Sequence, residues 1–291
     1  MAKHTNSITI KDTDSNIRLD RYLVNLLNVP QGLVQKDLRK GLIRVNDRRV
    51  TGKYRIQEDD IIHLVKEYQE NKPKERIEPN KKDLEDLKKS IIYSQDDFFI
   101  INKWNRIAVQ GGSGVKSNLD DILHHANLYK SRPLLVHRLD KDTSGILIFA
   151  LNRHSAKYFF DLFSKRKIDK KYEAIVIGEP IKTEGIFEND IEEDGVIYHA
   201  KTKYKIIRKL SSDLTHLELK PITGRKHQLR IHCKLNGLPI LGDNKYYLPI
   251  SKIYKNEKNL FLHAKEINFK DLSGKKVKVE AKLPNHFFNY I

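Results

Sequence analysis

The sequence predicts an α+β protein of two unequal domains, the larger of which contains a mixed, mainly antiparallel sheet. Two observations support this fold class. Strand-like stretches dominate the second part of the chain with few helical stretches between them, and a charged, apolar-poor segment at 66–88 separates that part from a smaller N-terminal region. Because parallel strands need crossover connections that are usually helices, a strand-rich chain with few helices favours antiparallel pairing.

The composition is that of a polar, basic chain. Its 291 residues include 55 Lys+Arg and 38 Asp+Glu, a net charge of +17. The longest apolar run, Ile146 to Leu151, is far shorter than the ~20 residues that span a bilayer, and the first ten residues lack the apolar stretch of a secretory signal. The single cysteine, Cys233, cannot form an internal disulfide, which indicates a reducing compartment. We therefore expect a cytoplasmic protein that has no membrane partner and binds a polyanion.

The charge also suggests the domain boundaries. Residues 1–65 carry 12 Lys+Arg and 8 Asp+Glu, residues 66–88 carry seven of each, and residues 89–291 carry 36 and 23. We expect a small domain over 1–65, a solvated linker over 66–88 with a weak helix from Lys81 onward, and a large domain over 89–291. A uniformly basic proteome would give the same excess charge without any nucleic acid partner, so the positions of the charges must decide.

Local patterns predict the elements of the small domain in order. Residues 7–10 are β-like, and apolar residues at helical spacing predict a helix over 19–27. A second helix over 33–40 ends at Gly41, the usual residue just past a helix C-terminus. Residues 42–50, with an Asn-Asp turn in the middle, predict a hairpin.

Basic side chains gather on the second of these helices and on the hairpin. They fit a solvated surface, and they equally fit a platform that meets a phosphate backbone. The candidate RNA-binding residues are Arg18, Arg21, Lys36, Arg39, Lys40 and Arg44. The runs RLDRYLVNLL, VQKDLRKGLIRVNDRRV and IQEDDIIHL resemble the αL RNA-binding domain, first seen in a small-subunit ribosomal protein, over roughly residues 16–65. Phosphate contacts from such a module would position RNA without reading its sequence.

The large domain alternates strand-like and turn-like stretches. Strands are predicted at 98–101, 145–150, 172–177, 204–207 and 217–219, and helices at 155–165 and 227–235.

Three common kinds of site are absent from the sequence. The segment GGSGVKS at 111–117 lacks the spacing of a phosphate-binding P-loop. His227 and His232 are five residues apart with no glutamate between them, unlike a zinc-protease motif, so we expect no metal site. Cys233 has no partner in sequence that would suggest a nucleophile, and we expect it to be buried.

Three polar runs remain as candidates for a site. The run HRLDKDTSG at 137–145 leads directly into a buried strand, a rigid support for a functional loop. Its aspartates, Asp140 and Asp142, could equally cap a turn. The run TGRKHQLRIH at 223–232 suits phosphate and base contacts, although a solvated helix start would look similar, and GLPILGD follows at 237–243.

Together these runs resemble the RluA family of RNA pseudouridine synthases. The ordered set HRLDKDTSG, KKYEAIVIG, PITGRKHQLRIH, GLPILGDNKYY and LHA carries the resemblance over roughly residues 89–291. It implies a mixed sheet with flanking helices and a central cleft, and a reaction that needs no metal or organic cofactor. An αL domain before such a domain is typical of enzymes that modify large-subunit ribosomal RNA. The stretch NKWNRIAVQGGSG resembles the branch that acts at several sites in that RNA.

The resemblance also implies roles for individual residues. Asp140 is the carboxylate beside the glycosidic bond of the target uridine, and Arg230 is the arginine that keeps it ionised. Arg138 would fill the gap left by the extruded base and Tyr172 would stack on that base. By composition Arg225 and Gln228 suit RNA contacts.

Two positions depart from the family pattern, because Trp104 stands where proline is usual and Gln110 where many members have histidine. Both lie outside the HRLD and GRKHQLR runs, so they bear on the shape of this loop rather than on the chemistry.

The leading hypothesis is a monomeric, cytoplasmic pseudouridine synthase that acts on large-subunit ribosomal RNA. One alternative is the same enzyme acting on transfer RNA. The other is a non-catalytic RNA-binding or ribosome-assembly factor, against which the intact HRLD run argues.

Overall fold

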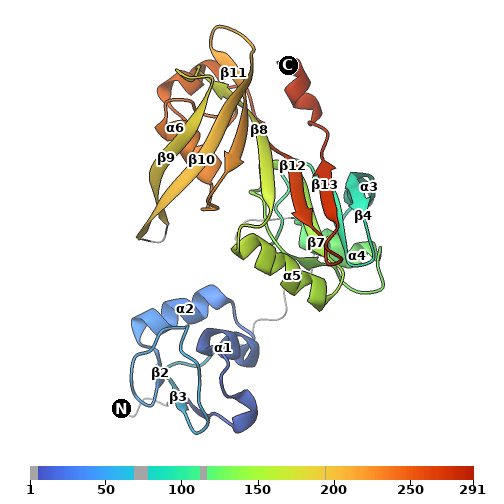
Figure 1. Cartoon of the computed structure of the whole chain (residues 1–291). Helices are drawn as coiled ribbons and strands as arrows, with labels where there is room; N and C mark the ends of the chain where they lie inside the picture. Colours follow the sequence, from blue (N-terminus) through green and yellow to red (C-terminus); the bar gives the residue numbers. More distant parts are fainter. Residues whose placement is uncertain (1–5, 69–77, 112–116, 194) are drawn as a thin grey trace. The chain divides into compact units, whose positions relative to one another are not determined.

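The computed structural model describes residues 6–68, 78–111, 117–193 and 195–291 (Figure 1). The chain divides into two compact units, Met1–Arg76 and Ile77–Ile291. Across the described segments, no helix is both long enough and apolar enough to cross a membrane. Of the GGSGVKS segment, residues 112–116 lie outside the described residues.

The first unit combines a three-stranded antiparallel sheet, in the order β1-β3-β2, with two helices. Its elements are β1 (Asn6–Thr9), a 3₁₀ helix (Asp12–Asp14), α1 (Leu19–Leu27), α2 (Gln31–Lys40), β2 (Ile43–Val45) and β3 (Ile61–Leu64). The apolar faces of both helices are buried with the inner face of the sheet in a single core. Gly41 ends α2 with a left-handed φ of 70°. The strand and both helices predicted here are confirmed.

The hairpin predicted over 42–50 is wrong in its second arm. Pairing beyond the turn stops at a single bridge between Val45 and Arg48, and β2 pairs with β3 instead. The side chain of Asn46 accounts for this choice. Its carbonyl oxygen accepts the Ile61 N–H at 2.9 Å, which ties the turn to the start of β3.

The helix expected from Lys81 onward is α3 (Lys81–Ser90), and it belongs to the second unit. Asn80 caps it by accepting the Asp83 N–H at 2.7 Å. Leu87 is fully buried in the core of the second unit. Residues 81–88 of the segment expected as a linker therefore pack on the second unit through an apolar face, while residues 69–77 of that segment lie outside the described residues.

The second unit is built on one mixed sheet with the strand order β4-β5-β7-β12-β8-β11-β10-β9, with β13 beside β12 and β6 beside β7. Its strands are β4 (Ile91–Ser94), β5 (Phe98–Lys103), β6 (Leu134–Leu135), β7 (Ser144–Ala150), β8 (Asp169–Ile177), β9 (Glu184–Glu193), β10 (Val196–Lys209), β11 (Leu214–Pro221), β12 (Leu262–Lys270) and β13 (Lys276–Glu280). Its other helices are α4 (Leu119–Ala126), α5 (Arg153–Ser164), α6 (Gln228–Leu235) and the 3₁₀ helices Pro249–Tyr254 and Asn285–Asn289.

Two cores flank the middle of this sheet. One is formed mainly by β5, β7, α4 and α5, and the other by β8, β11, α6 and the segment around Phe261. Figure 1 shows β8 passing between these two halves, with α6, β9 and β10 in one and α4, α5 and β7 in the other. Tyr172 on β8 packs against both cores. A mid-sheet boundary between two cores is a position where a cleft can open.

The parallel pairing of β7 with β12 depends on a glycine. Within the described residues, all the other strand pairings of this sheet are antiparallel, so the predicted mixed, mainly antiparallel sheet is confirmed. Gly145 has a φ of 109°, and a Cβ placed there would lie 2.3 Å from the carbonyl oxygen of Ala264. Only glycine allows this approach, which sets the end of the 137–145 loop directly against β12.

The predicted strands of this unit lie within β5, β7, β8, β10 and β11, and the predicted helices within or beside α5 and α6. These predictions are confirmed. The sequence did not predict α4, β9, β12 or β13.

Candidate active site

A cavity of about 200 Å³ opens in the second unit where the loop before β7, the start of β8 and the loop before α6 meet. We call it the active-site cavity. Six of the residues that the sequence singled out line it: Arg138, Asp140, Tyr172, Arg225, Gln228 and Arg230. The three separate polar runs therefore supply one site or its supports.

The loop that carries Asp140 is held at both ends. His137 accepts the backbone N–H of Ile148 on its Nε2 at 2.9 Å and stacks on Phe163 at 4.3 Å. Burial lowers the pKa of His137 to about 3, with a smaller effect from Lys170, so this ring stays neutral as an acceptor. Ser144, at the start of β7, pairs its Oγ with Nδ1 of His263 at 2.9 Å.

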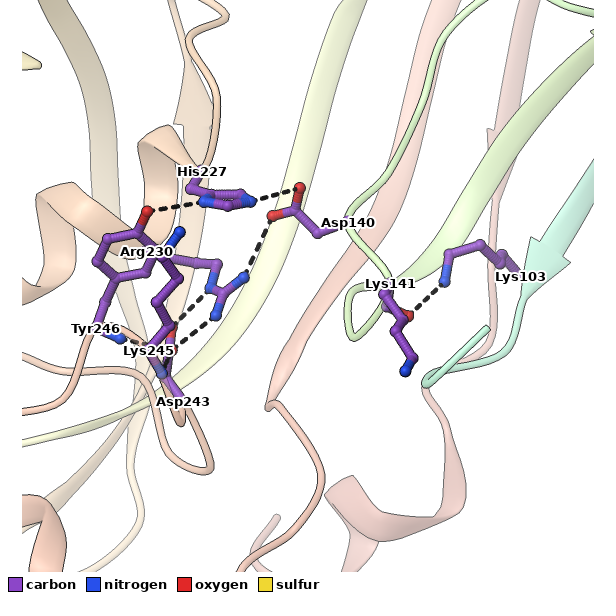
Figure 2. A network of polar contacts seen from close by, with 8 residues as sticks. All are labelled: Lys103, Asp140, Lys141, His227, Arg230, Asp243, Lys245 and Tyr246. Atoms are coloured by element: carbon purple, nitrogen blue, oxygen red, sulfur yellow. Dashed lines mark hydrogen bonds and ion pairs between the residues drawn. The ribbon is translucent and has the colours of Figure 1, made fainter. Parts of the chain in front are cut away.

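Lys103 stabilises the same loop through hydrogen bonds to backbone carbonyl groups. It is 0% exposed, and its Nζ donates to the carbonyl oxygens of Trp104, Ile107 and Lys141 at 3.0–3.1 Å. Figure 2 shows the contact with Lys141, the residue after Asp140. Burial lowers the pKa of Lys103 to about 7, against the opposing charges of the loop aspartates. A buried lysine whose three donors are all used fixes the backbone next to Asp140.

Asp140 faces two nitrogen donors across the cavity. Its Oδ2 lies 3.6 Å from Nη1 of Arg230 and its Oδ1 lies 3.4 Å from Nε2 of His227 (Figure 2). Its side chain is 27% exposed, whereas that of Arg230 is 7% exposed. The carboxylate thus remains accessible to a ligand while its charge is balanced from one side.

Arg230 is itself held by a second carboxylate. Asp243 is fully buried and accepts from Nε and Nη2 of Arg230 at 2.7 and 2.8 Å, a bidentate pair (Figure 2). It also accepts the backbone N–H groups of Lys245 and Tyr246 at 2.9 Å. Burial opposes ionisation of Asp243, but the hydrogen bonds from Arg230 and the backbone bring its pKa below its ordinary value.

The turn that presents Asp243 depends on the preceding residue. Gly242 has a φ of 74°, and a Cβ there would lie 1.9 Å from the carbonyl oxygen of Asn259. The buried carboxylate is therefore set by a turn that only glycine allows.

His227 connects Asp140 to Tyr246. Its Nδ1 lies 2.7 Å from the Tyr246 hydroxyl, and burial is the main cause that lowers its pKa. Because the Asp140 carboxylate can only accept, the proton of the neutral ring belongs on Nε2, and Nδ1 accepts from the tyrosine hydroxyl. His227 and Arg230 are three residues apart at the start of α6, so both reach the same carboxylate.

Tyr172 presents its ring to the cavity from β8. It is partly buried between the two cores. Burial, and to a lesser extent the charge of Asp140, raise the pKa of its hydroxyl above the ordinary value. The side chain therefore offers a neutral aromatic surface beside a carboxylate.

The other three residues that the sequence singled out in this cavity, Arg138, Arg225 and Gln228, range from exposed to buried. Arg138 is exposed at the cavity mouth. The guanidinium of Arg225 lies 4.1 Å from the ring centroid of Tyr198. Gln228 differs from the expected RNA contact, because it is 3% exposed and all of its amide contacts are inside the protein. It accepts from Thr223 and the Arg225 N–H, and it donates to the Lys201 carbonyl and the Thr202 hydroxyl.

The basic residues of the first unit are exposed on α2 and β2 and at the start of α1. They are Arg18, Arg21, Lys36, Arg39, Lys40 and Arg44. Arg18 differs from the rest because it donates twice to the buried Asp20, at 2.6 and 3.1 Å. Its guanidinium is therefore partly committed to holding the start of α1.

Four residues of this site were not proposed from the sequence: Lys103, His227, Asp243 and Tyr246. All four lie in runs that carried the family resemblance, and the spacing of His227 and Arg230 was a further available signal. Among the described residues, no group of three or more His, Cys, Asp or Glu side chains could hold a metal ion. Cys233 is buried, and burial raises its pKa, as expected of an inert thiol.

Comparisons with known proteins agree with this geometry. A model described as RNA pseudouridylate synthase matches residues 97–235, and a model of the S4 domain matches residues 17–62. The chain is 36% identical over 300 residues to ribosomal large subunit pseudouridine synthase C of Rickettsia typhi, covering 95% of this chain and 97% of that protein. It is 31% identical over 295 residues to the protein of the same name from Vibrio cholerae, covering 96% and 93%.

A solved structure has a similar fold. Human RNA pseudouridylate synthase domain containing 4 superposes with a TM-score of 0.60 at 26% identity, over 70% of this chain and 92% of that one. The two units thus define an RNA-modifying enzyme, an isomerase with an RNA-binding module at its N-terminal side. The chain belongs to the RNA pseudouridylate synthase family, as the sequence runs indicated.

Proposed function

We propose that the chain converts uridine to pseudouridine in large-subunit ribosomal RNA, with Asp140 as the reacting carboxylate. The observation that carries the proposal is the position of Asp140. It is the carboxylate that lines the active-site cavity, and it faces Arg230 and His227 on one side only. The choice of RNA rests on relatives that are named for the large ribosomal subunit and share most of this chain.

The chemistry asks for an ionised carboxylate at a flipped base. The enzyme must detach uracil from C1′, rotate it and rejoin it through a ring carbon, so the base has to leave the stack. Arg230 Nη1 and His227 Nε2 lie 3.6 and 3.4 Å from the carboxylate oxygens of Asp140 and orient that side chain toward the cavity. Asp140 then acts as nucleophile or base, while Asp243 holds Arg230 in position.

Tyr172 and Arg138 would stabilise the extruded state of the target base. A cavity of about 200 Å³ suits one extruded nucleobase, and the ring of Tyr172 on its wall is placed to stack on it. Arg138, exposed at the mouth, is placed to occupy the gap left in the RNA. The exposed basic residues of the first unit would contact the phosphate backbone of the same RNA and position it without reading its sequence. We also propose that the enzyme is cytoplasmic and monomeric.

The test of catalysis compares two substitutions in one loop. Asp140→Asn removes the charge but keeps the shape, so pseudouridine formation in large-subunit RNA transcripts should stop while RNA binding persists. Asp142→Asn is the matched control, because Asp142 lies two residues away and does not line the cavity. Undiminished turnover by the Asp140→Asn protein would refute the assignment.

Transfer RNA is the alternative substrate. Mapping pseudouridine in both RNA classes from cells that lack the gene separates the two, because uridines should remain unmodified in the large-subunit RNA under our proposal. Loss of modification confined to transfer RNA would overturn the substrate assignment but not the chemistry. RNA binding without any isomerisation would favour an assembly factor instead.

A further inference from the structure

A second, larger cavity adjoins the active-site cavity and has no role in the mechanism above. Its volume is about 770 Å³, and it lies among the end of α5, the start of β8 and the neighbouring parts of β10, β11 and β12. We call it the flanking cavity. The residues that line both cavities form the boundary between them: Phe163, Lys170, Pro221, Thr223, Gly224 and Arg225. The two cavities are therefore immediate neighbours, one on either side of these residues.

The wall of the flanking cavity is strongly basic. Six of its sixteen lining residues are Lys or Arg, against two acidic residues, Asp169 and Glu266. Glu266 is already neutralised, because Lys171 and Lys278 lie 3.3 and 3.1 Å from its carboxylate. The remaining cations give the cavity an excess of positive charge that favours an anionic ligand.

Several of these cations have no anionic partner. In the part of the chain that the structure describes, Lys170, Arg166 and Lys203 have no carboxylate within 4.0 Å. Lys170 is partly buried, its Nζ is 5.9 Å from the Phe163 ring centroid, and burial together with Arg166 lowers its pKa. An anion in the cavity would relieve this repulsion and desolvation.

Arg225 adds a separate observation at the boundary. Its Nε is buried and has no hydrogen-bond partner, while its guanidinium lies against Tyr198. Among the described residues, no hydrogen bond or ion pair uses the other nitrogens of this guanidinium either, so they remain available to an acceptor on a ligand in the adjoining cavity. A phosphate oxygen is such an acceptor, and arginine forms strong, charge-assisted hydrogen bonds with phosphate.

We propose that the flanking cavity binds the RNA nucleotide next to the target uridine, with its phosphodiester among Lys170, Lys203 and Arg225. This rests on the proposed function, because the target base occupies the active-site cavity and its neighbour is covalently attached. Single-stranded RNA suits a basic groove that follows the backbone without reading the sequence. The site would therefore contribute affinity and positioning at one side of the target.

Lys203 offers the sharpest test because β10 supplies its own control. Lys203 and Lys205 are two residues apart on one strand, so they share a face, and both are exposed, but only Lys203 lines the flanking cavity. The substrate is a synthetic RNA that contains a uridine which the wild-type protein converts. A matched series replaces one phosphodiester at a time near that uridine with a neutral methylphosphonate.

For one linkage next to the target, the methylphosphonate should raise the KM of the wild-type protein roughly threefold to tenfold, as expected when one hydrogen bond to a phosphate is removed. Lys203→Gln should raise KM for the unmodified RNA by a similar factor and respond less to the methylphosphonate at that linkage. It should also reduce the slope of log Kd against log salt by about 0.7. Lys205→Gln should behave as the wild-type protein in all three measurements.

Equal methylphosphonate effects in wild-type and Lys203→Gln proteins at every linkage, with equal salt slopes, would overturn the inference and leave the proposed function standing. A wild-type protein that converts no uridine would overturn the proposed function first and the inference with it. The linkage that shows the coupling identifies which neighbour, 5′ or 3′, occupies the flanking cavity.

Discussion

Lys103→Met should change how the stability of the second unit depends on pH. The folded protein lowers the pKa of Lys103 to about 7, whereas an unfolded lysine titrates near 10.4. Between these values the unfolded chain binds the extra proton, so the free energy of unfolding rises with pH. The rise approaches 1.4 kcal/mol per pH unit, which gives about 2 kcal/mol between pH 7 and pH 9. Methionine keeps the length and removes the proton, so this contribution disappears.

The assay uses the single tryptophan of the chain. Trp104 follows Lys103 and packs against the core of the second unit, so its fluorescence during urea unfolding reports on that unit alone. The difference in unfolding free energy between wild type and Lys103→Met should grow in favour of the wild type as pH rises from 7 to 9. Removal of the three hydrogen bonds from Nζ to carbonyl oxygens shifts this difference by an amount that varies little with pH. Lys89→Met, at a surface position, is the control and should give a flat difference. A flat or falling difference for Lys103→Met would refute the reasoning.

Three further substitutions test the supports of the site. Asp243→Asn leaves the buried charge of Arg230 without its partner, which should cost about 3–5 kcal/mol in urea unfolding and lower kcat; an unchanged unfolding midpoint would contradict the role of this pair. Tyr246→Phe removes the donor to Nδ1 of His227 and should lower kcat/KM about twofold to tenfold, with full activity as the contrary result. Gly145→Ala places a Cβ 2.3 Å from a β12 carbonyl oxygen and should prevent accumulation of folded protein, so a soluble variant with wild-type stability would show that the strands can separate.

The fold was predictable where a single strand or helix carries its own pattern. The amphipathic helix Leu19–Leu27 and the apolar strand Ser144–Ala150 were both expected from the sequence. The pairing of β2 was predicted wrongly, because its partner is β3, which is more than ten residues away in sequence. The hydrogen bond from the Ile61 N–H to the side chain of Asn46 joins the two. β9 was missed for a related reason. Its sequence is mostly polar, and it is held in the sheet by its pairing with β10 rather than by an apolar pattern of its own.

The site was predictable as far as the motifs that carried the family resemblance. Those motifs drew attention to Asp140, Arg230 and Tyr172, which line one cavity. They could not show that Gln228 turns inward, because a polar side chain beside a glycine looks the same whether it contacts RNA or braces a loop. Lys103 was missed because the residues around a lysine in sequence do not indicate whether its side chain is buried, as it is here against the loop that carries Asp140.

The place of β12 in the sheet has a consequence for biosynthesis. β12 (Leu262–Lys270) lies between β7 and β8, which are made more than 80 residues earlier, because β8 ends at Ile177 and β12 begins at Leu262. Until it leaves the ribosome, the nascent chain holds two half-sheets with unpaired edges that attract other strands. Leu262 also lines the active-site cavity, so the cleft closes only at this late stage. The active-site cavity therefore lacks part of its wall on a nascent chain until β12 has left the ribosome.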